Sequence, residues 1–285
     1  MLRRNRKRAR AEASDTNAGP IDDDIDEFST PDITPELDDT LATLQLLIQR
    51  NEAGFIRIDS PPIIFTHQLY TVLSNRTAVD QSLYRFRQDG TLVCFRIPTG
   101  PDEYAVIRQS DFKSILRKWE AALRPVDPIT DKSISVANDE KIAALVALQR
   151  ALPRLAAQNV LTTDVLIDVL TSTLGGDDEE AFRTHIKNLQ RLGFLLTTPQ
   201  LDNQAYQLSV PGVGKLVTAV KKTRSDILSV LKRTKYKEAF EHQLKKTKLR
   251  RSKLDMEYHL TDMEGCGLVR RTQVTSGTLV SLVNK

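Results

Sequence analysis

Three stretches of the chain carry the same helical pattern of apolar positions. In each, two apolar residues lie four apart, a third follows three residues on, and a glycine comes four residues later. The three sets are Val79, Leu83, Phe86 and Gly90; Phe182, Ile186, Leu189 and Gly193; and Met256, Leu260, Met263 and Gly267. One such helical face is common, but each set here precedes two strand-like segments joined by a turn. The recurrence therefore predicts a repeated structural unit.

Further apolar segments with helical spacing precede each repeat, at residues 41–49 and 61–73, 141–155 and 161–174, and 214–233 and 236–246. Three helices followed by a hairpin are typical of a winged helix, whose last helix can lie in a DNA major groove. We therefore predict an α+β, mostly α, fold of three tandem winged-helix domains after a disordered N-terminal tail. The predicted bounds are 1–36 for the tail, 37–124, 138–211 and 212–285 for the winged helices, and 125–137 for a proline-marked linker.

The tail is predicted from its composition, because residues 11–36 are acidic, interrupted by proline and poor in apolar side chains. Its first ten residues hold a basic cluster that resembles a nuclear localisation signal, formed by Arg3, Arg4, Arg6, Lys7, Arg8 and Arg10. No apolar run is long enough to predict a membrane span, and Cys94 and Cys266 form no C-x-x-C pair. We expect a nuclear protein with no membrane segment, no metal site and no cofactor.

Charge is distributed unevenly, although the net charge is only +4. Residues 11–212 hold 18 basic and 30 acidic residues, whereas residues 213–285 hold 17 basic and 7 acidic ones. A basic C-terminal quarter beside an acidic middle favours a polyanion-binding surface. Lysine-rich clusters suit backbone phosphates, so we predict mainly sequence-independent binding of duplex DNA with steep salt dependence. The predicted contacts are Lys215, Lys221, Lys222, Arg224, Lys232, Arg233, Lys235, Lys245, Lys246, Lys248, Arg250 and Arg251.

The three predicted third helices differ in the face that they are expected to show to solvent. The first two offer basic and amide side chains, namely Gln81, Arg85 and Arg87, and Arg183, Lys187, Gln190 and Arg191. The third is expected to expose Asp255, Glu257, His259, Asp262 and Glu264, a mostly acidic face that phosphate would repel. The preceding stretch KRTKYKEAFEHQLKKTKLRRSK (residues 232–253) is predicted as a helical approach, with Tyr236, Phe240 and Leu244 in the core.

Several strings, read in order, resemble one known family: PPIIFTHQLYTVL, NRTAVDQSLYRFRQDG, YQLSVPGVGKLV, LKRTKYKE and TSGTLVSL. From about Pro61 to the C-terminus, the chain is similar to the serine/threonine-protein kinase 19 family. The resemblance implies three tandem winged helices, nuclear location and DNA binding in transcription-coupled nucleotide excision repair. It also implies double-stranded DNA and transcription and repair proteins as partners, including the stalled RNA polymerase II complex and the repair helicase machinery.

The family name implies kinase activity as well, but the sequence holds no glycine-rich loop, H-R-D or D-F-G. The string GVGK at Gly212–Lys215 fails the Walker pattern, because Ser209 and Leu216 occupy its glycine and Ser/Thr positions. We interpret it as a turn that opens a helix. The leading hypothesis is a non-enzymatic nuclear DNA-binding scaffold without catalytic residues, and a protein kinase and a pure protein adaptor are the alternatives.

Overall fold

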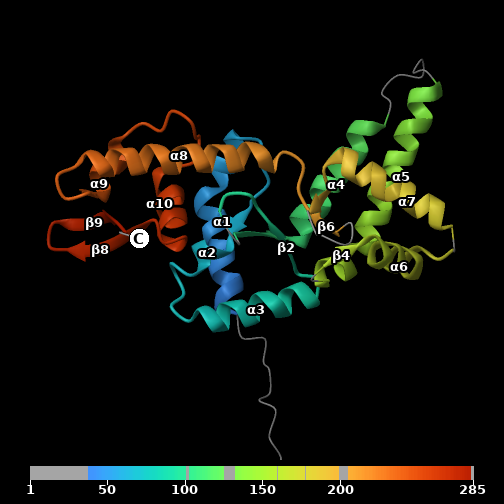
Figure 1. Cartoon of the computed structure of the whole chain (residues 1–285), viewed down its shortest axis with the longest axis horizontal. Coiled ribbons are helices and arrows are strands. Elements are labelled where there is room, and N and C mark those ends of the chain that lie inside the picture. Colours follow the sequence, from blue (N-terminus) through green and yellow to red (C-terminus); the bar gives the residue numbers. More distant parts are fainter. Residues whose placement is uncertain are drawn as a thin grey trace, which may run out of the picture. The chain divides into compact units, whose positions relative to one another are not determined.

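One order of elements occurs three times along the described chain: a helix, a short strand, two helices and a two-stranded hairpin (Figure 1). The structure is a computed structural model that describes residues 38–100, 103–124, 132–158, 160–176, 178–198 and 205–283. The predicted tail and its basic cluster therefore lie outside the described residues.

The first winged helix contains α1 (Asp39–Arg57), β1 (Ile64–Phe65), α2 (Thr66–Leu69), α3 (Arg76–Gln88), β2 (Leu92–Arg96) and β3 (Tyr104–Arg108). α1 begins at Asp39 because the side chain of Asp38 accepts hydrogen bonds from the N–H groups of Thr40 and Leu41. β3 pairs antiparallel with β1 on one side and with β2 on the other. The short first strand therefore ties the helices to the hairpin.

The second and third winged helices repeat this topology, with sheet orders β4-β6-β5 and β7-β9-β8. The second contains α5 (Lys132–Ala157), β4 (Leu161–Thr162), α6 (Thr163–Leu174), α7 (Glu179–Leu192), β5 (Leu195–Thr198) and β6 (Ala205–Leu208). The third contains α8 (Val213–Arg233), β7 (Glu238–Phe240), α9 (Glu241–Lys246), α10 (Met256–Gly265), β8 (Val269–Val274) and β9 (Gly277–Leu282). An additional helix, α4 (Gln109–Leu123), follows the first hairpin, and α5 begins within the predicted linker. The domain bounds stay a prediction.

The repeated apolar pattern lies on α3, α7 and α10, the third helix of each winged helix. All nine of its apolar side chains are buried. The glycine that ends each set, Gly90, Gly193 or Gly267, adopts a left-handed φ of +76°, +81° or +72°. Glycine has no Cβ to clash in this conformation and so ends a helix at little cost. The predicted fold class, mostly helical α+β with winged helices, is confirmed.

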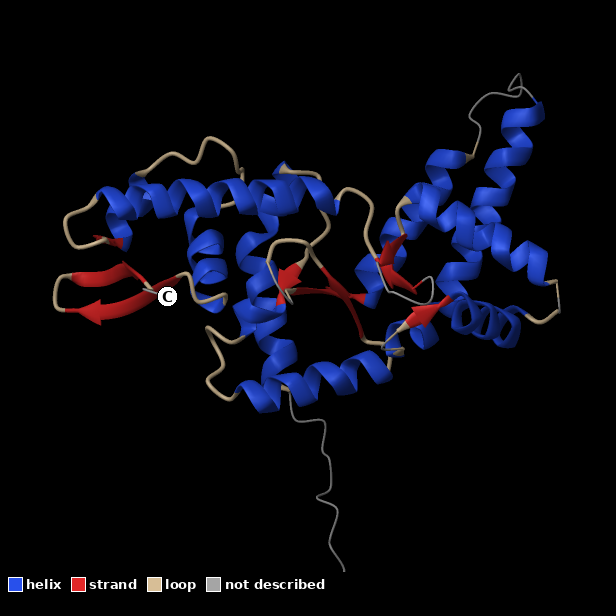
Figure 2. Ribbon diagram, in the orientation of Figure 1, coloured by secondary structure: helices blue, strands red, loops and turns tan. Residues whose placement is uncertain are grey.

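Two hydrophobic cores organise the described chain. One is shared by the first and second winged helices, and the other lies within the third. α8 contributes to both, because Leu216 and Val220 belong to the shared core whereas Ile227 and Leu231 belong to the third. Figure 2 shows α8 as one uninterrupted helix. The helix therefore joins the third winged helix to the rest of the protein.

Candidate nucleic-acid interface

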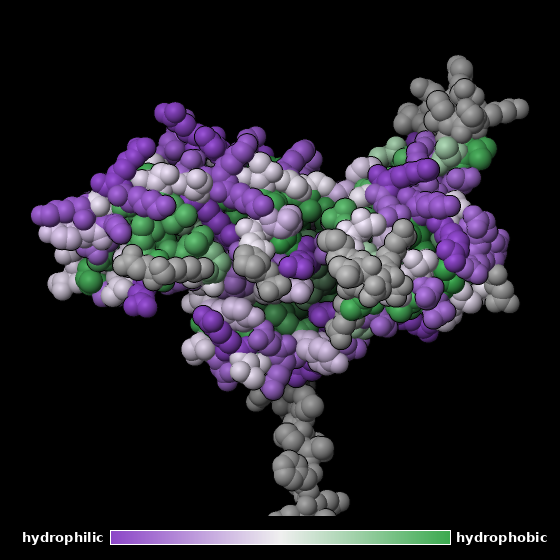
Figure 3. Space-filling view, in the orientation of Figure 1, coloured by the Kyte–Doolittle hydropathy of each residue, from purple (hydrophilic) through white to green (hydrophobic). Residues whose placement is uncertain are grey.

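α8 presents exposed cations from a helix whose apolar side is buried. Gly212, with φ of +88°, is the N-cap residue, which confirms that GVGK is a turn opening a helix. The buried apolar residues leave five predicted contacts exposed: Lys215, Lys221, Lys222, Lys232 and Arg233. Figure 3 shows hydrophilic side chains gathered along this helix. α8 is thus the most regular part of the candidate interface.

The chain after α8 differs from the predicted helical approach. It turns at 234–237, forms β7 against β9, and then forms the short helix α9. Of the three side chains expected in the core, only Leu244 is buried; Phe240 is half-buried, and Tyr236 is 70% exposed. The prediction was wrong for Tyr236 because pairing with β9 requires an extended backbone at Glu238–Phe240, which breaks the helical register.

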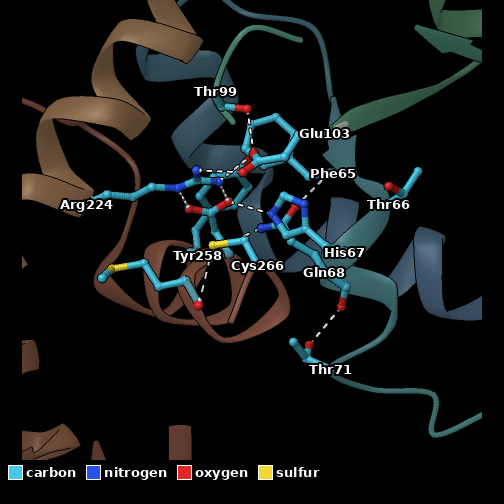
Figure 4. Close-up of polar contacts among 12 residues, drawn as sticks. Phe65, Thr66, His67, Gln68, Thr71, Thr99, Glu103, Arg224, Tyr258 and Cys266 are labelled. Atoms are coloured by element: carbon cyan, nitrogen blue, oxygen red, sulfur yellow. Dashed lines mark hydrogen bonds and ion pairs between the residues drawn. The ribbon is translucent and has the colours of Figure 1, made fainter. Parts of the chain in front are cut away.

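Arg224 does not reach the surface. Its guanidinium donates to Asp262 at 2.7 Å through Nε and Nη2, and to Glu103 at 3.0 and 2.9 Å through Nη1 and Nη2 (Figure 4). Burial alone would lower the pKa of Arg224, but these hydrogen bonds raise it above its usual range. Two carboxylates already neutralise this charge in the interior, so we leave Arg224 out of the proposed interface.

Asp262 connects the third winged helix to the first. It is fully buried and also lies 2.8 Å from His67 Nε2, on α2. Burial would raise the pKa of Asp262, yet the hydrogen bonds from Arg224 and His67 hold it below its ordinary value. Beside it, the Gln68 side-chain amide donates to the carbonyl oxygen of Tyr258 at 3.3 Å. α2 and α10 therefore meet through a buried polar network.

This contact corrects the predicted solvent face of α10. His259 and Asp262 are buried rather than exposed. The Tyr258 ring packs edge-on against Phe55 and Phe65 of the first winged helix, at centroid distances of 5.9 and 6.1 Å. Since α2 and α1 cover the helix, α10 cannot enter a major groove in this arrangement. The expectation that the third helix does not read bases therefore has a steric reason beside its charge.

Of the other acids on the expected face, Glu257 and Glu264 pair with cations of their own winged helix, whereas the exposed Asp255 lies 3.6 Å from Arg57 of α1. Glu257 accepts from Lys245 at 2.7 Å and from Arg271 at 2.8 Å, while Glu264 accepts from Arg271 at 2.6 Å. Burial would raise the pKa of Glu257, but the two cations lower it to about 2. Lys245, which also contacts Glu241, is consequently less available to phosphate than the other predicted contacts.

α3 is also engaged within the chain. Arg85 pairs with Asp38, and Arg87 donates to the carbonyl oxygens of Ala156 and Gln158 at the end of α5. α7 leaves its basic side chains exposed, although Arg183 pairs with Glu179. α7 therefore keeps three exposed basic side chains on its solvent face, namely those of Arg183, Lys187 and Arg191.

The other predicted contacts are exposed and most have no ion pair with another described residue. They are Lys215, Lys221, Lys222, Lys232, Arg233, Lys235, Lys246, Lys248, Arg250 and Arg251. The exception is Arg251, whose Nε lies 3.7 Å from Asp226. Lys215, Lys222 and Arg251 line one hollow, whereas Lys221 and Lys232 line a cleft toward the first winged helix. Cations without carboxylate partners can exchange their counterions for phosphates.

Sequence reasoning missed the residues that hold α8 and α10 in place. Glu103, His67 and Gln68 lie more than a hundred positions from the residues of α8 and α10 that they contact. No local spacing could reveal such contacts, because they depend on how the winged helices pack. Among the described residues, no His, Cys, Asp and Glu cluster is suited to a metal ion, and no helix has the length and apolar character for crossing a membrane.

Comparison with known proteins supports the resemblance seen in the sequence. The family model described as inactive serine-threonine protein kinase 19 matches residues 47–282. A Homo sapiens protein named Winged helix repair factor 1 is 26% identical over 246 residues, which cover 85% of this chain and 84% of that protein. Its Dictyostelium discoideum namesake is 27% identical over 276 residues, covering 92% and 68%. The Xenopus laevis namesake is 26% identical over 228 residues, covering 78% and 75%.

Proposed function

This chain belongs to the inactive serine-threonine protein kinase 19 family, and on that premise we propose that it is a nuclear, non-enzymatic scaffold in DNA repair that binds duplex DNA. Its relatives carry the name Winged helix repair factor 1, which supports a repair-related role. The observation that carries DNA binding is the set of exposed cations on α8, in the following turn, on α9 and in the loop before α10.

The proposed mode of binding is contact with backbone phosphates. Lysine and arginine side chains on an exposed surface neutralise phosphates without reading the sequence, and each contact releases counterions. The third helix of the same winged helix is covered by α1 and α2, so it supplies no base readout. The protein would then bind duplex DNA with little sequence preference, at sites to which partner proteins recruit it.

Within repair, we propose a transcription-coupled role. The partners would be the stalled RNA polymerase II complex and the repair helicase machinery, as the family resemblance implies. An exposed helix such as α7 or the acidic middle of the chain would be available for protein contacts while the basic surface holds DNA. Pull-down of these complexes from irradiated cells, compared between the wild type and variants of α7, tests this part separately from DNA binding.

DNA binding is tested by fluorescence anisotropy of a labelled duplex across a salt series. We expect log affinity to fall steeply with log salt, by about 0.9 per phosphate neutralised. The turn triple removes three charges at the end of α8 and in the following turn: Lys232→Gln, Arg233→Gln and Lys235→Gln. The control triple removes three exposed charges on α4 and α5: Arg117→Gln, Lys118→Gln and Arg150→Gln.

The turn triple should flatten the salt slope by about one for each phosphate that the variant no longer neutralises, while the control triple keeps the wild-type slope. An affinity that does not change with salt concentration would contradict the proposal. The kinase alternative would instead be supported if calorimetry showed tight Mg–ATP binding that is lost when Lys215 is replaced. Unchanged partner recruitment and repair after charge removal would favour the adaptor.

A further inference from the structure

One hollow brings together predicted cations from two distant parts of the third winged helix. It measures about 570 Å³ and is lined by Gly214, Lys215, Thr218, Ala219, Lys222 and Arg251. Lys215, Thr218 and Lys222 lie on one side of α8, because spacings of three, four and seven residues return to the same helical face. Arg251 reaches the hollow from the loop between α9 and α10.

The lining is suited to an anion, because all of its charged side chains are cations. Lys215 and Lys222 are exposed and have no ion pair with another described residue. Gly214 and Ala219 carry little or no side chain, which leaves room for a group to approach the helix closely. One end of the hollow, at Gly214 and Lys215, lies in the first turn of α8, where the partial positive charge of the helix N-terminus adds to the cations.

The carboxylate that pairs with Arg251 does little to neutralise these groups. Asp226 lies 3.7 Å from Arg251 Nε, beyond hydrogen-bond length, and both side chains are about half exposed. The neighbouring cleft is different, since there Lys221 and Lys232 share the lining with Asp80 and Glu103. The α8 cations therefore divide into two faces, one of mixed charge and one that is almost wholly positive.

We propose that the hollow seats one phosphate of the DNA backbone and so fixes the register of the duplex along α8. This inference rests on the proposed DNA-binding function and names an anchoring contact within it. Lys215 and Lys222 would supply point charges, Thr218 a hydroxyl donor, and Arg251 a planar guanidinium able to donate two hydrogen bonds to a phosphodiester. The other exposed cations would touch separate phosphates along the strand.

The hollow and the separate phosphate contacts should differ in how their removal changes the slope of log affinity against log salt. The hollow triple consists of Lys215→Gln, Lys222→Gln and Arg251→Gln. It removes three charges that share a single phosphate, so the salt slope should change by about 0.9. Affinity at about 150 mM salt should nevertheless fall on the order of 100-fold, because several charge-assisted hydrogen bonds disappear together. The turn triple should change the slope by up to about 2.7.

A conservative variant separates geometry from charge. Arg251→Lys keeps the charge but loses the planar pair of donors, so the slope should stay at the wild-type value while affinity falls several-fold. Equal slopes and equal reductions in affinity for the hollow and turn triples would overturn the anchor and leave general DNA binding intact. A wild-type protein that binds no duplex at any salt would overturn the proposed function itself.

A probe without DNA distinguishes the source of the phosphate. Calorimetric titration with pyrophosphate should show weak binding by the full chain that the hollow triple loses and the control triple keeps. Pyrophosphate should also compete with labelled duplex for the wild type. Binding of a phosphoserine peptide at the hollow that duplex DNA fails to displace would overturn DNA as the occupant.

Discussion

At the scale of single residues, Arg224 shows that a cation in a basic segment need not lie on the surface. In the sequence it stands among the lysines of a basic segment, and nothing local separates it from them. In the structure its side chain is 8% exposed and pairs with Asp262 and Glu103, which come from α10 and from the segment before β3. Predicting this requires the tertiary arrangement, because the partners lie 38 and 121 positions away.

Replacing Arg224 with methionine tests its structural role. Asp262 and Glu103 would lose their cation while remaining buried, and a buried charge without its partner typically costs about 3–5 kcal/mol. The free energy of unfolding of the third winged helix, taken from the urea transition followed by circular dichroism, should fall by this amount. Arg251→Met removes an equal charge from an exposed site and should change stability by less than about 0.5 kcal/mol. Equal effects of both variants would contradict the structural assignment.

His259 gives the protein a pH-dependent stability. Its burial lowers the pKa to about 4, against an ordinary value of about 6.5 in the unfolded chain. Between pH 6.5 and 4, His259 is protonated in the unfolded state but neutral in the folded state. The free energy of unfolding therefore decreases as the pH falls. The loss should reach roughly 3 kcal/mol at pH 4 from this residue.

Urea denaturation between pH 7.5 and 4.5 measures this loss. In His259→Gln, which keeps a polar partner for Ser252, the decline above about pH 5 should be smaller than in the wild type, and the remainder comes from His185, whose burial also lowers its pKa. Glu103, Glu257 and Asp262 contribute below about pH 5, because their pKa values are depressed in the fold. Identical pH profiles for the wild type and the variant would refute the role of His259.

At the scale of elements, the sequence predicted the repeated third helices well, because burial of one helical face imposes the spacing of Val79, Leu83 and Phe86 and its two repeats. The sequence-based prediction failed where contact with an element distant in the chain determines the local structure. Tyr236, Phe240 and Leu244 fit a helix by spacing, but pairing of β7 with β9 overrides it. The face of α10 that was expected to be exposed is covered by α2. Contact with a second helix produces no repeating pattern in the sequence of the covered helix, so residue spacing could not predict it.

The close approach of α10 and α2 predicts the effect of a methyl group at Gly265. A Cβ there would overlap the backbone carbonyl of His67, which cannot move aside as a flexible side chain would. Gly265→Ala should therefore destabilise the protein by about 1–3 kcal/mol. In Gly214→Ala the added Cβ meets nothing within 4 Å, so helix propensity should instead stabilise by about 0.5–1 kcal/mol. Thermal denaturation of both variants checks the opposite signs.

At the scale of the whole described chain, α8 couples parts that the sequence suggests are separate domains. Its first half packs in the core shared by the first two winged helices, and its second half packs in the core of the third. The buried network of Arg224, Asp262, His67 and Glu103 adds a second connection. The sequence shows only that almost no linker separates Val210 from α8; it does not show which surfaces meet.

This coupling predicts that the winged helices unfold together. Trp119, the single tryptophan, packs edge-on against Phe194 at a centroid distance of 6.3 Å and so reports on the shared core. Far-UV circular dichroism reports on all helices, including those of the third winged helix. In the wild type, the two signals should follow one urea transition, because exposing α10 also uncovers α1 and α2.

In Arg224→Met, the third winged helix loses its buried connection but keeps its own core, so circular dichroism should change at lower urea than Trp119 fluorescence. The control Arg251→Met should keep the signals coincident. Separate transitions already in the wild type would mean that α8 and the network do not couple the cores. Because the proposed phosphate contacts lie on α8, a variant that uncouples the cores should also weaken DNA binding without losing any exposed cation.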